Sequence, residues 1–390
     1  MFCTIVGGVS DPLLENLDQQ LAAARRDLAP NITLGPAFRS RTGTNGLDQL
    51  SEVSLPTELI ARPFGRGALT ASVTPTFLSA GKVPLDLNSQ ARFGTGVFTG
   101  HRAPSGQTAQ GVGLSLGYQL DWLRADVGTS PLGFVEQNIL GGVELAPHLS
   151  DNVVLRVTGE RRSVTDSVLS YAGTKDPGTG ISWGGVTRLR GHGQLELSLG
   201  AANLYIGGGY SVLDGTRVVS NQAYAAGAGG SSPIWRDQTD ELRLGMDVVY
   251  FGYSKNLDFF TLGQGGYFSP QSYFATLLPL TYTSKHDNLT WSIGGALGYQ
   301  VYNEDASAVF PNNPELQNAL VALAATSAVP VLTYYPGANA SGVVGNVHGS
   351  IEYHFNNVFS LGGQASYQHA GNWSEAIGRV FARYIFDGGI

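Results

Sequence analysis

Cysteine, charge and long apolar runs are all scarce in this chain of 390 residues. With Cys3 as its one cysteine, the chain cannot build an internal disulfide framework. Charged residues make up 14% of the sequence, whereas soluble domains carry about 25%. No stretch approaches the roughly 18 consecutive apolar residues that a transmembrane helix needs. These shortages exclude a disulfide-stapled domain and a helical membrane protein, and they disfavour an ordinary soluble domain.

Glycine and aromatic residues are abundant instead, with 53 Gly, 17 Tyr and 17 Phe. Mean hydropathy is -0.01, close to zero. A membrane β-barrel has this profile, because its apolar side chains are spread singly along strands. The net charge is -7, and the Lys and Arg residues are scattered without forming a basic stripe. We therefore expect no nucleic-acid partner.

The N-terminal segment differs from the rest of the chain. Met1 to Val9 is short and apolar, but no Lys or Arg precedes it and no small-residue cleavage site follows, so it does not read as a signal peptide. Residues 10–29 predict one helix, with Pro12 in its first turn and leucines at helical spacing. Either the chain is a fragment of a longer exported protein or its start is mis-assigned. We favour the fragment.

From residue 31 onward the hydrophobic period is two, as in β-strands. Leu189, Leu195 and Leu197 share one face of a long run, and Arg188 and Glu196 share the other. Alternation by itself does not separate a membrane barrel from a soluble sandwich. Connection lengths do, because outer-membrane barrels have short turns at one rim and long loops at the other. That pattern is present here, with long loops expected at 80–110, 163–183, 214–239 and 303–342.

The sequence predicts an all-β fold, a transmembrane antiparallel β-barrel of about 16 strands preceded by one short N-terminal helix. Residues 1–30 form the N-terminal helical part and residues 31–390 form the barrel. A short helix is also expected near 314–325 inside the last long loop. The predicted strands lie near 32–41, 52–62, 68–79, 111–120, 122–129, 138–147, 152–162, 184–200, 203–213, 240–253, 257–263, 272–283, 288–302, 343–355, 358–369 and 376–386.

Several loop motifs carry a family resemblance. They read DVGTSPLGF (126–134), RRSVTDSVLSYAG (161–173), DPGTG (176–180), WGGVTR (183–188) and GGYFSPQ (265–271), with FRSRTG (38–43) near the first strand. From about residue 13 to its end, the chain resembles the C-terminal domain of cellulose synthase operon protein C, the outer-membrane export subunit of bacterial cellulose synthesis.

This resemblance implies a sixteen-stranded pore in outer-membrane lipid through which a glucan chain, cellulose or a related polymer, passes outward. It also implies that a periplasmic array of helical repeats links the barrel to the inner-membrane cellulose synthase complex. The chain lacks that array, and residues 10–29 resemble the helix that joins it to the barrel. Coupling to a synthase is therefore an implication of the family alone.

We expect the motif loops to form an exit gate at the long-loop rim. A β-glucan presents flat apolar sugar faces and a rim of hydroxyls, so a translocating site should offer aromatic platforms that bind weakly and repeatedly. The candidates for this role are Tyr171, Trp183, Tyr267, Phe268 and, with less support, Trp235. The alternative for each aromatic is packing at the membrane interface or within a loop.

Charged residues of both signs lie on the polar face of the predicted strands, opposite the apolar side chains. We expect them to face the lumen, pair across it and leave a hydrated wall for a neutral polymer. A polar interior is also normal for any such barrel, since charges facing lipid cost about 2–4 kcal/mol at the midplane. The candidates are Arg156, Glu160, Arg162, Arg188, Glu196, Arg243, Asp247 and Glu352.

Enzymatic chemistry has little support in the sequence. The seven His residues are dispersed, no zinc-ligand or serine-nucleophile motif is present, and the Gly-rich stretches lack the Lys-Ser/Thr of a phosphate loop. We expect no catalytic residue, no metal and no cofactor. The rivals to polysaccharide export are a general or sugar-selective diffusion porin and, with the least support, an outer-membrane enzyme.

Overall fold

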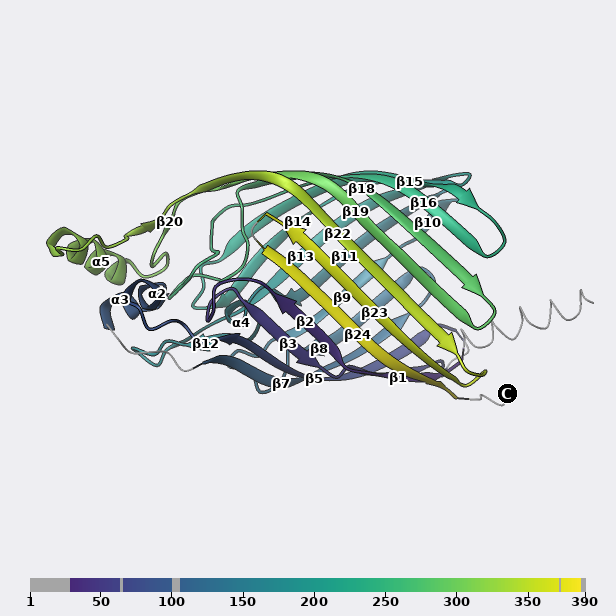
Figure 1. Ribbon diagram of the computed structural model, residues 1–390, viewed down its shortest axis with the longest axis horizontal. Coiled ribbons are helices and arrows are strands. Elements are labelled where there is room, and N and C mark those ends of the chain that lie inside the picture. The colour runs from purple at the N-terminus through teal and green to yellow at the C-terminus, as the bar shows by residue number, and fades with distance from the viewer. Residues whose placement is uncertain (1–28, 64–65, 100–105, 372, 387–390) are drawn as a thin grey trace, which may run out of the picture.

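The computed structural model describes residues 29–63, 66–99, 106–371 and 373–386. The helix predicted over 10–29 falls outside these residues in all but its last position, so it stays a prediction. In the described residues, the chain forms a closed antiparallel barrel of sixteen strands (Figure 1). The predicted fold class is confirmed.

The first and last strands of the chain close the barrel. The first strand has two parts, β1 (Asn31–Leu34) and β2 (Ala37–Arg41), and both pair with β24 (Trp373–Ile385). The second strand is divided in the same way into β3 (Leu50–Ser54) and β4 (Thr57–Ala61). Pro36 and Pro56 lie at the two breaks, where a proline cannot donate to the ladder.

The remaining strands follow in chain order around the wall, each antiparallel to its neighbours. They are β5 (Ala68–Gly81), β7 (Gln107–Gln119), β8 (Leu123–Thr129), β9 (Ile139–Leu145), β11 (Val153–Ser163) with the short β10 (His148–Ser150) before it, β13 (Ser182–Leu199), β14 (Ala202–Thr216), β15 (Asn221–Arg236), β16 (Asp240–Tyr253), β18 (Ser272–His286), β19 (Leu289–Glu304), β22 (Ala338–His354) and β23 (Phe359–Ala370).

The predicted number of strands is correct because two errors cancel. Residues 214–239 were expected to be a long loop, but most of them form β15. Glycine and alanine dominate this strand, so it shows almost no alternation of large apolar and polar side chains. Residues 257–263 were expected to be a strand of the wall, but they lie in a loop whose two-residue β17 (Phe260–Thr261) pairs in parallel with β6 (Phe93–Gly94).

The barrel has an apolar outer wall and a polar inner wall. Leu189, Ile206, Met246 and Leu297 stand 54–66% exposed on the outward parity of their strands. Charged residues occupy the opposite parity. None of the described helices is both long enough and apolar enough to cross a membrane.

The two rims of the barrel differ, as predicted. The rim where β1 begins and β24 ends carries only short connections (Figure 1). The opposite rim carries the long loops with their helices α2 (Leu87–Ala91), α3 (Gly96–Thr99), α4 (Val168–Ala172) and α5 (Pro314–Thr326), together with the short pairing of β20 (Ser307–Ala308) and β21 (Tyr334–Tyr335). The helix expected near 314–325 is therefore confirmed.

The largest buried apolar cluster lies among these loops and the strand ends beneath them. Trp183, Leu257, Phe310 and Leu320 are among its most deeply buried members, each at most 1% exposed. A water-filled barrel needs no such cluster for its wall, because the wall is held by strand pairing. The loops therefore fold into a packed body of their own at one mouth of the barrel.

Candidate functional site: the loop cluster at the barrel mouth

Residues 164–173, here called the crossing segment, lie inside the mouth. The segment leaves the wall at the end of β11 and contains α4, which contacts β5 and β7. Ser167 caps α4 in a capping box with Ser170, and both side chains are fully buried. Gly173 ends the helix with φ at 70°, which favours glycine. This short helix needs such caps because a single turn is not stable alone.

Two arginines of β2 hold the crossing segment from another part of the wall. Arg39 Nη1 donates to Thr165 O at 2.9 Å, and Arg41 Nη1 donates to Asp166 O at 3.2 Å. The Arg41 guanidinium also lies 3.5 Å from the Asp166 carboxylate. Along one side of the wall, β3–β4, β5, β7, β8 and β9 separate β2 from β11. The contacts therefore run through the lumen, and the segment spans the opening as a chord.

Residues 254–271, the connection between β16 and β18, pack on the crossing segment and are here called the inner loop. Ser167 Oγ donates to Gly266 O at 2.6 Å. The backbone N–H of Phe268 donates to Asp166 Oδ2 at 3.1 Å. Gly266 has φ at 63°, and an added Cβ would lie 2.9 Å from Ser167 Oγ. Three motifs that are distant in the sequence thus meet here: 38–43, 161–173 and 265–271.

The DPGTG motif folds the neighbouring turn. Asp176 is 1% exposed, and its carboxylate accepts from the backbone N–H and hydroxyl of Thr95 and from those of Thr179, at 2.6 to 2.8 Å. These four bonds account for the burial of a charged group. Asp176 therefore joins the connection between β5 and β7 to the connection between β11 and β13, which contains the crossing segment.

Residues 305–337 form an outer layer, here called the outer loop, which carries α5 (Figure 1). Gln264 Nε2 donates to Ser307 Oγ at 3.0 Å and to Ala308 O at 2.8 Å. The rings of Phe259 and Tyr335 stack with centroids 3.7 Å apart. The outer loop is therefore fastened to the inner loop, and the inner loop to the crossing segment.

Two of the aromatic candidates are buried in this cluster. Trp183 is 0% exposed and lies 5.5 Å from the ring of Phe93, and Tyr267 is 1% exposed. Burial raises the pKa of the Tyr267 phenol, and its hydroxyl accepts from Asn221 Nδ2 at 3.2 Å. Neither ring offers a free face to a sugar in this conformation, so their position fits packing within the loops.

The other aromatic candidates lie in three different places. Tyr171 packs edge-on against Phe134 at 5.2 Å, and burial raises its pKa to about 12. Phe268 is partly exposed and meets the ring of Tyr302 at 5.2 Å. Trp235 lies near the end of β15 at the short-turn rim, 48% exposed, where its ring stacks on Tyr282. Trp235 was expected in a long loop, and the structure places it at the other end of the barrel.

Sequence reasoning missed a row of aromatic side chains on the inner wall below the loops. Phe251 stacks on Tyr273 at 4.4 Å, and Tyr273 stacks on Tyr302 at 6.5 Å. The three residues come from β16, β18 and β19. Their inward direction follows from the parity of the charged lumen residue Asp247, four positions before Phe251. That parity was present in the sequence and could have located the row.

The charged candidates lie on the inner wall and most have partners of opposite charge. Arg156 lies between Glu144 and Glu196, with its Nε 2.7 Å from the latter. Further contacts link Arg162 to Asp126 and Glu160, Arg188 to the Tyr253 hydroxyl at 2.7 Å, Arg243 to Glu241 at 2.9 Å, Glu352 to Arg383 at 2.9 Å, and Asp247 to the Tyr205 hydroxyl at 2.9 Å.

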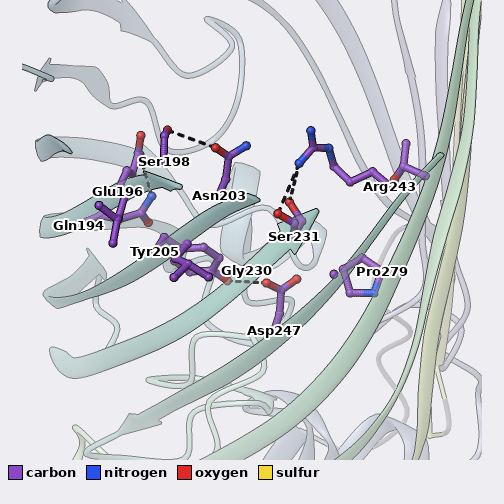
Figure 2. Close-up of a pocket in the computed structure, with 14 residues that line it drawn as sticks. Gln194, Glu196, Ser198, Asn203, Tyr205, Gly230, Ser231, Arg243, Asp247 and Pro279 are labelled. Atoms are coloured by element: carbon purple, nitrogen blue, oxygen red, sulfur yellow. Dashed lines mark hydrogen bonds between the residues drawn. The ribbon is translucent and has the colours of Figure 1, made fainter. Parts of the chain in front are cut away.

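Part of this wall encloses a hollow of about 520 Å³ in the half of the barrel away from the loops. Figure 2 shows Glu196, Tyr205, Asp247 and Arg243 directed into it from neighbouring strands. In the part of the chain that the structure describes, no three His, Cys, Asp or Glu side chains gather as the ligands of a metal would. The inner wall is thus polar, and most of its charged candidates are paired.

A comparison with known proteins agrees with this architecture. Residues 48–387 match the family described as "Cellulose synthase operon protein C C-terminus (BCSC_C)". The chain belongs to this family. It is 44% identical, over 95% of its length, to "Cellulose synthase 2 operon protein C" of Komagataeibacter xylinus, and 32% identical, over 98%, to "Cellulose synthase operon protein C" of Pseudomonas fluorescens.

The chain spans 28% and 29% of the length of these two operon protein C relatives. A solved structure, "Bacterial polysaccharide outer membrane secretin", superposes with a TM-score of 0.56, at 10% identity, over 92% of this chain and 98% of that one. This likeness supports the fold. With its closed wall and apolar outer face, this operon protein C barrel is an outer-membrane protein.

Proposed function

We propose that this barrel is the passage through which a polysaccharide, cellulose (β-1,4-glucan), leaves the cell, and that the loop cluster is its exit gate. The observation that carries the proposal is the meeting of three distant motifs inside one mouth of the barrel. Residues 38–43, 161–173 and 265–271 build one plug, held by hydrogen bonds and an apolar core.

The inner wall suits a neutral, hydrated polymer. Its charges are paired within the wall, as Arg156 is with Glu144 and Glu196. Paired charges in a wet lumen hold a small solute weakly, while wall hydroxyls and carboxylates can exchange hydrogen bonds with sugar hydroxyls. A passage for a long polymer requires many weak contacts, since tight binding at one point would stall the chain.

We propose further that passage is driven by synthesis behind the barrel, with no cofactor and no chemical step at the barrel itself. The relatives' names tie the family to a cellulose synthase operon. Coupling to an inner-membrane synthase complex through a periplasmic helical-repeat region is part of the proposal. So is the assignment of residues 1–30 as the remnant of that region.

Export can be tested in a cellulose-producing cell whose own operon protein C barrel is replaced by this chain's barrel. Glucose released by cellulase is measured from intact cells and again after lysis. The proposal expects most of the glucan outside intact cells, and retention of glucan inside when the barrel is deleted. Equal amounts outside with and without the barrel would contradict it.

The rival reading is a diffusion porin, and the packed mouth argues against it. A porin lumen is open to small solutes at rest, whereas here the crossing segment spans the lumen. Conductance of the reconstituted barrel separates the two, since a porin conducts steadily and a gated exporter stays mostly closed. An enzymatic role would instead require that changing one carboxylate abolish activity in a barrel that still folds.

A further inference from the structure

Contacts with neighbouring strands of the wall hold the two arginines of β2 in place. Arg39 places its guanidinium 2.7 Å from Glu375 on β24 and 3.6 Å from Glu52 on β3. Arg41 lies over the ring of Trp373 on β24, with its Cζ 4.6 Å from the ring centroid. Both side chains are about 15% exposed. Partners on neighbouring strands thus set the orientation of both arginines, so the wall positions the crossing segment that they hold.

The crossing segment receives its polar tie to the far wall from these side chains. Thr165 O and Asp166 O accept from Arg39 and Arg41. The Asp166 carboxylate faces Arg41 at 3.5 Å and also accepts from the Phe268 N–H of the inner loop. One carboxylate therefore touches all three parts: the wall, the crossing segment and the inner loop.

We propose that Arg39 and Arg41 are the positioning residues of the gate, and that the Arg41–Asp166 contact is its releasable latch. The proposal rests on the function proposed above. Arg39 has two carboxylate partners of its own and keeps its place when the segment leaves. Arg41 loses its ion-pair partner Asp166 when the segment leaves, and Asp166 at the same moment releases the N–H of Phe268. Opening the mouth therefore breaks one ion pair that couples two loops.

The contacts that the crossing segment makes with β5 are of a different kind. On the side of β5, α4 packs by apolar contact, with Val168 and Ala172 buried against Leu78 and Ala80. Such contacts are non-directional and do not depend on salt. A charged latch does depend on it, because ionic strength screens a partly exposed pair. Asp166 is 33% exposed, so its pair with Arg41 is open to screening.

The full chain, reconstituted in planar bilayers, tests the latch without any glucan. Arg41→Gln and Asp166→Asn are each expected to raise the fraction of time spent open about fivefold, as expected from the loss of one partly exposed ion pair. Arg383→Gln is the matched control, because its ion pair with Glu352 lies on the wall away from the loops. It should leave the open fraction unchanged.

Two further measurements separate a latch from general loosening. The double variant Arg41→Gln/Asp166→Asn should open less than the two single effects combined would predict, because both variants remove the same ion pair. Raising KCl should increase the open fraction of the unaltered chain and leave that of Asp166→Asn flat. Asp166 lies in a loop, so Asp166→Asn tests the proposal even if Arg41→Gln does not fold.

An open fraction unchanged in Asp166→Asn, or raised as much by Arg383→Gln, would overturn the latch. These outcomes are independent of the export assay. If the latch variants open the pore but cellulose reaches the medium without the barrel, the proposed function fails and the latch stands. If export depends on the barrel and the variants do not open it, the reverse holds.

Discussion

Trp183 is the best single position at which to separate packing from sugar binding. Its side chain is 0% exposed within the loop core and packs against Phe93. Its indole Nε1 is buried and meets no hydrogen-bond partner among the residues that the structure describes. Trp183→Ala would remove the whole ring and leave a cavity, which costs about 3–5 kcal/mol for a buried aromatic residue. The loop body is small, so we expect this loss to unfold it while the barrel wall stays intact.

Two further substitutions serve as comparisons for this prediction. Trp183→Phe keeps an aromatic ring and removes the unpartnered N–H, whose burial itself costs about 1–3 kcal/mol. We therefore expect Trp183→Phe to be far milder than Trp183→Ala. Trp235→Ala is the matched control, because Trp235 is 48% exposed at the short-turn rim, away from the loops.

The assay combines limited proteolysis of the loops with conductance in planar bilayers. Trp183→Ala should be cut within the loops far faster than the unaltered chain and should conduct more often. Barrel folding, read as the shift in gel mobility on heating, should not change. Loops as protected in Trp183→Ala as in the unaltered chain would refute the reasoning. So would loss of cellulose export in Trp183→Phe with the loops intact, since that result would assign the indole to the sugar.

Three more outcomes follow from single contacts. Gly266→Ala should release the inner loop, because φ is 63° and the new methyl would clash at about 3 Å with the crossing segment; faster loop proteolysis checks it. The pKa of Asp258 is raised by burial and then by nearby Glu304, so its protonated form favours the closed loops in acid and this stabilisation fades as pH rises. The open fraction should therefore increase with pH, and Asp258→Asn should flatten that dependence. Arg156→Gln should leave Glu196 without its cationic partner and shift the selectivity of the open pore toward cations, as a reversal potential in a KCl gradient would show.

The strand pattern predicted most of the fold, because lipid on one side of the wall and water on the other impose a strict alternation of apolar and polar side chains. Leu189 and Leu195 against Arg188 and Glu196 sufficed to orient β13. The pattern failed where that contrast was missing. β15 is built largely from Gly, Ala and Ser, so its outward face carries few large apolar residues. Residues 257–263 are mostly apolar because they pack in the loop core. An apolar run in the sequence does not show whether it belongs to the barrel wall or to the loop core.

The candidate site was only partly predictable for a similar reason. The motifs marked loops that pack together at one mouth of the barrel, and parity placed the charged residues on the inner wall. Aromatic identity did not say whether a ring is buried or free, so Trp183 and Tyr267 were expected as sugar platforms although both lie inside the loop body. The hydrogen bonds from Arg39 and Arg41 to the crossing segment form because two parts of the barrel wall face each other across the lumen. No local pattern in the sequence contains that information.

The position of Arg39 has a consequence for how the protein is made. The nearer of this arginine's two carboxylate partners, Glu375, arrives with the last strand of the chain. Until the first and last strands meet, the anchor for the crossing segment is incomplete. A half-built barrel would thus hold its plug less firmly, and firm sealing of the mouth would follow closure of the wall. Assembly and sealing would then be coupled, so a cell would accumulate no finished pores standing open.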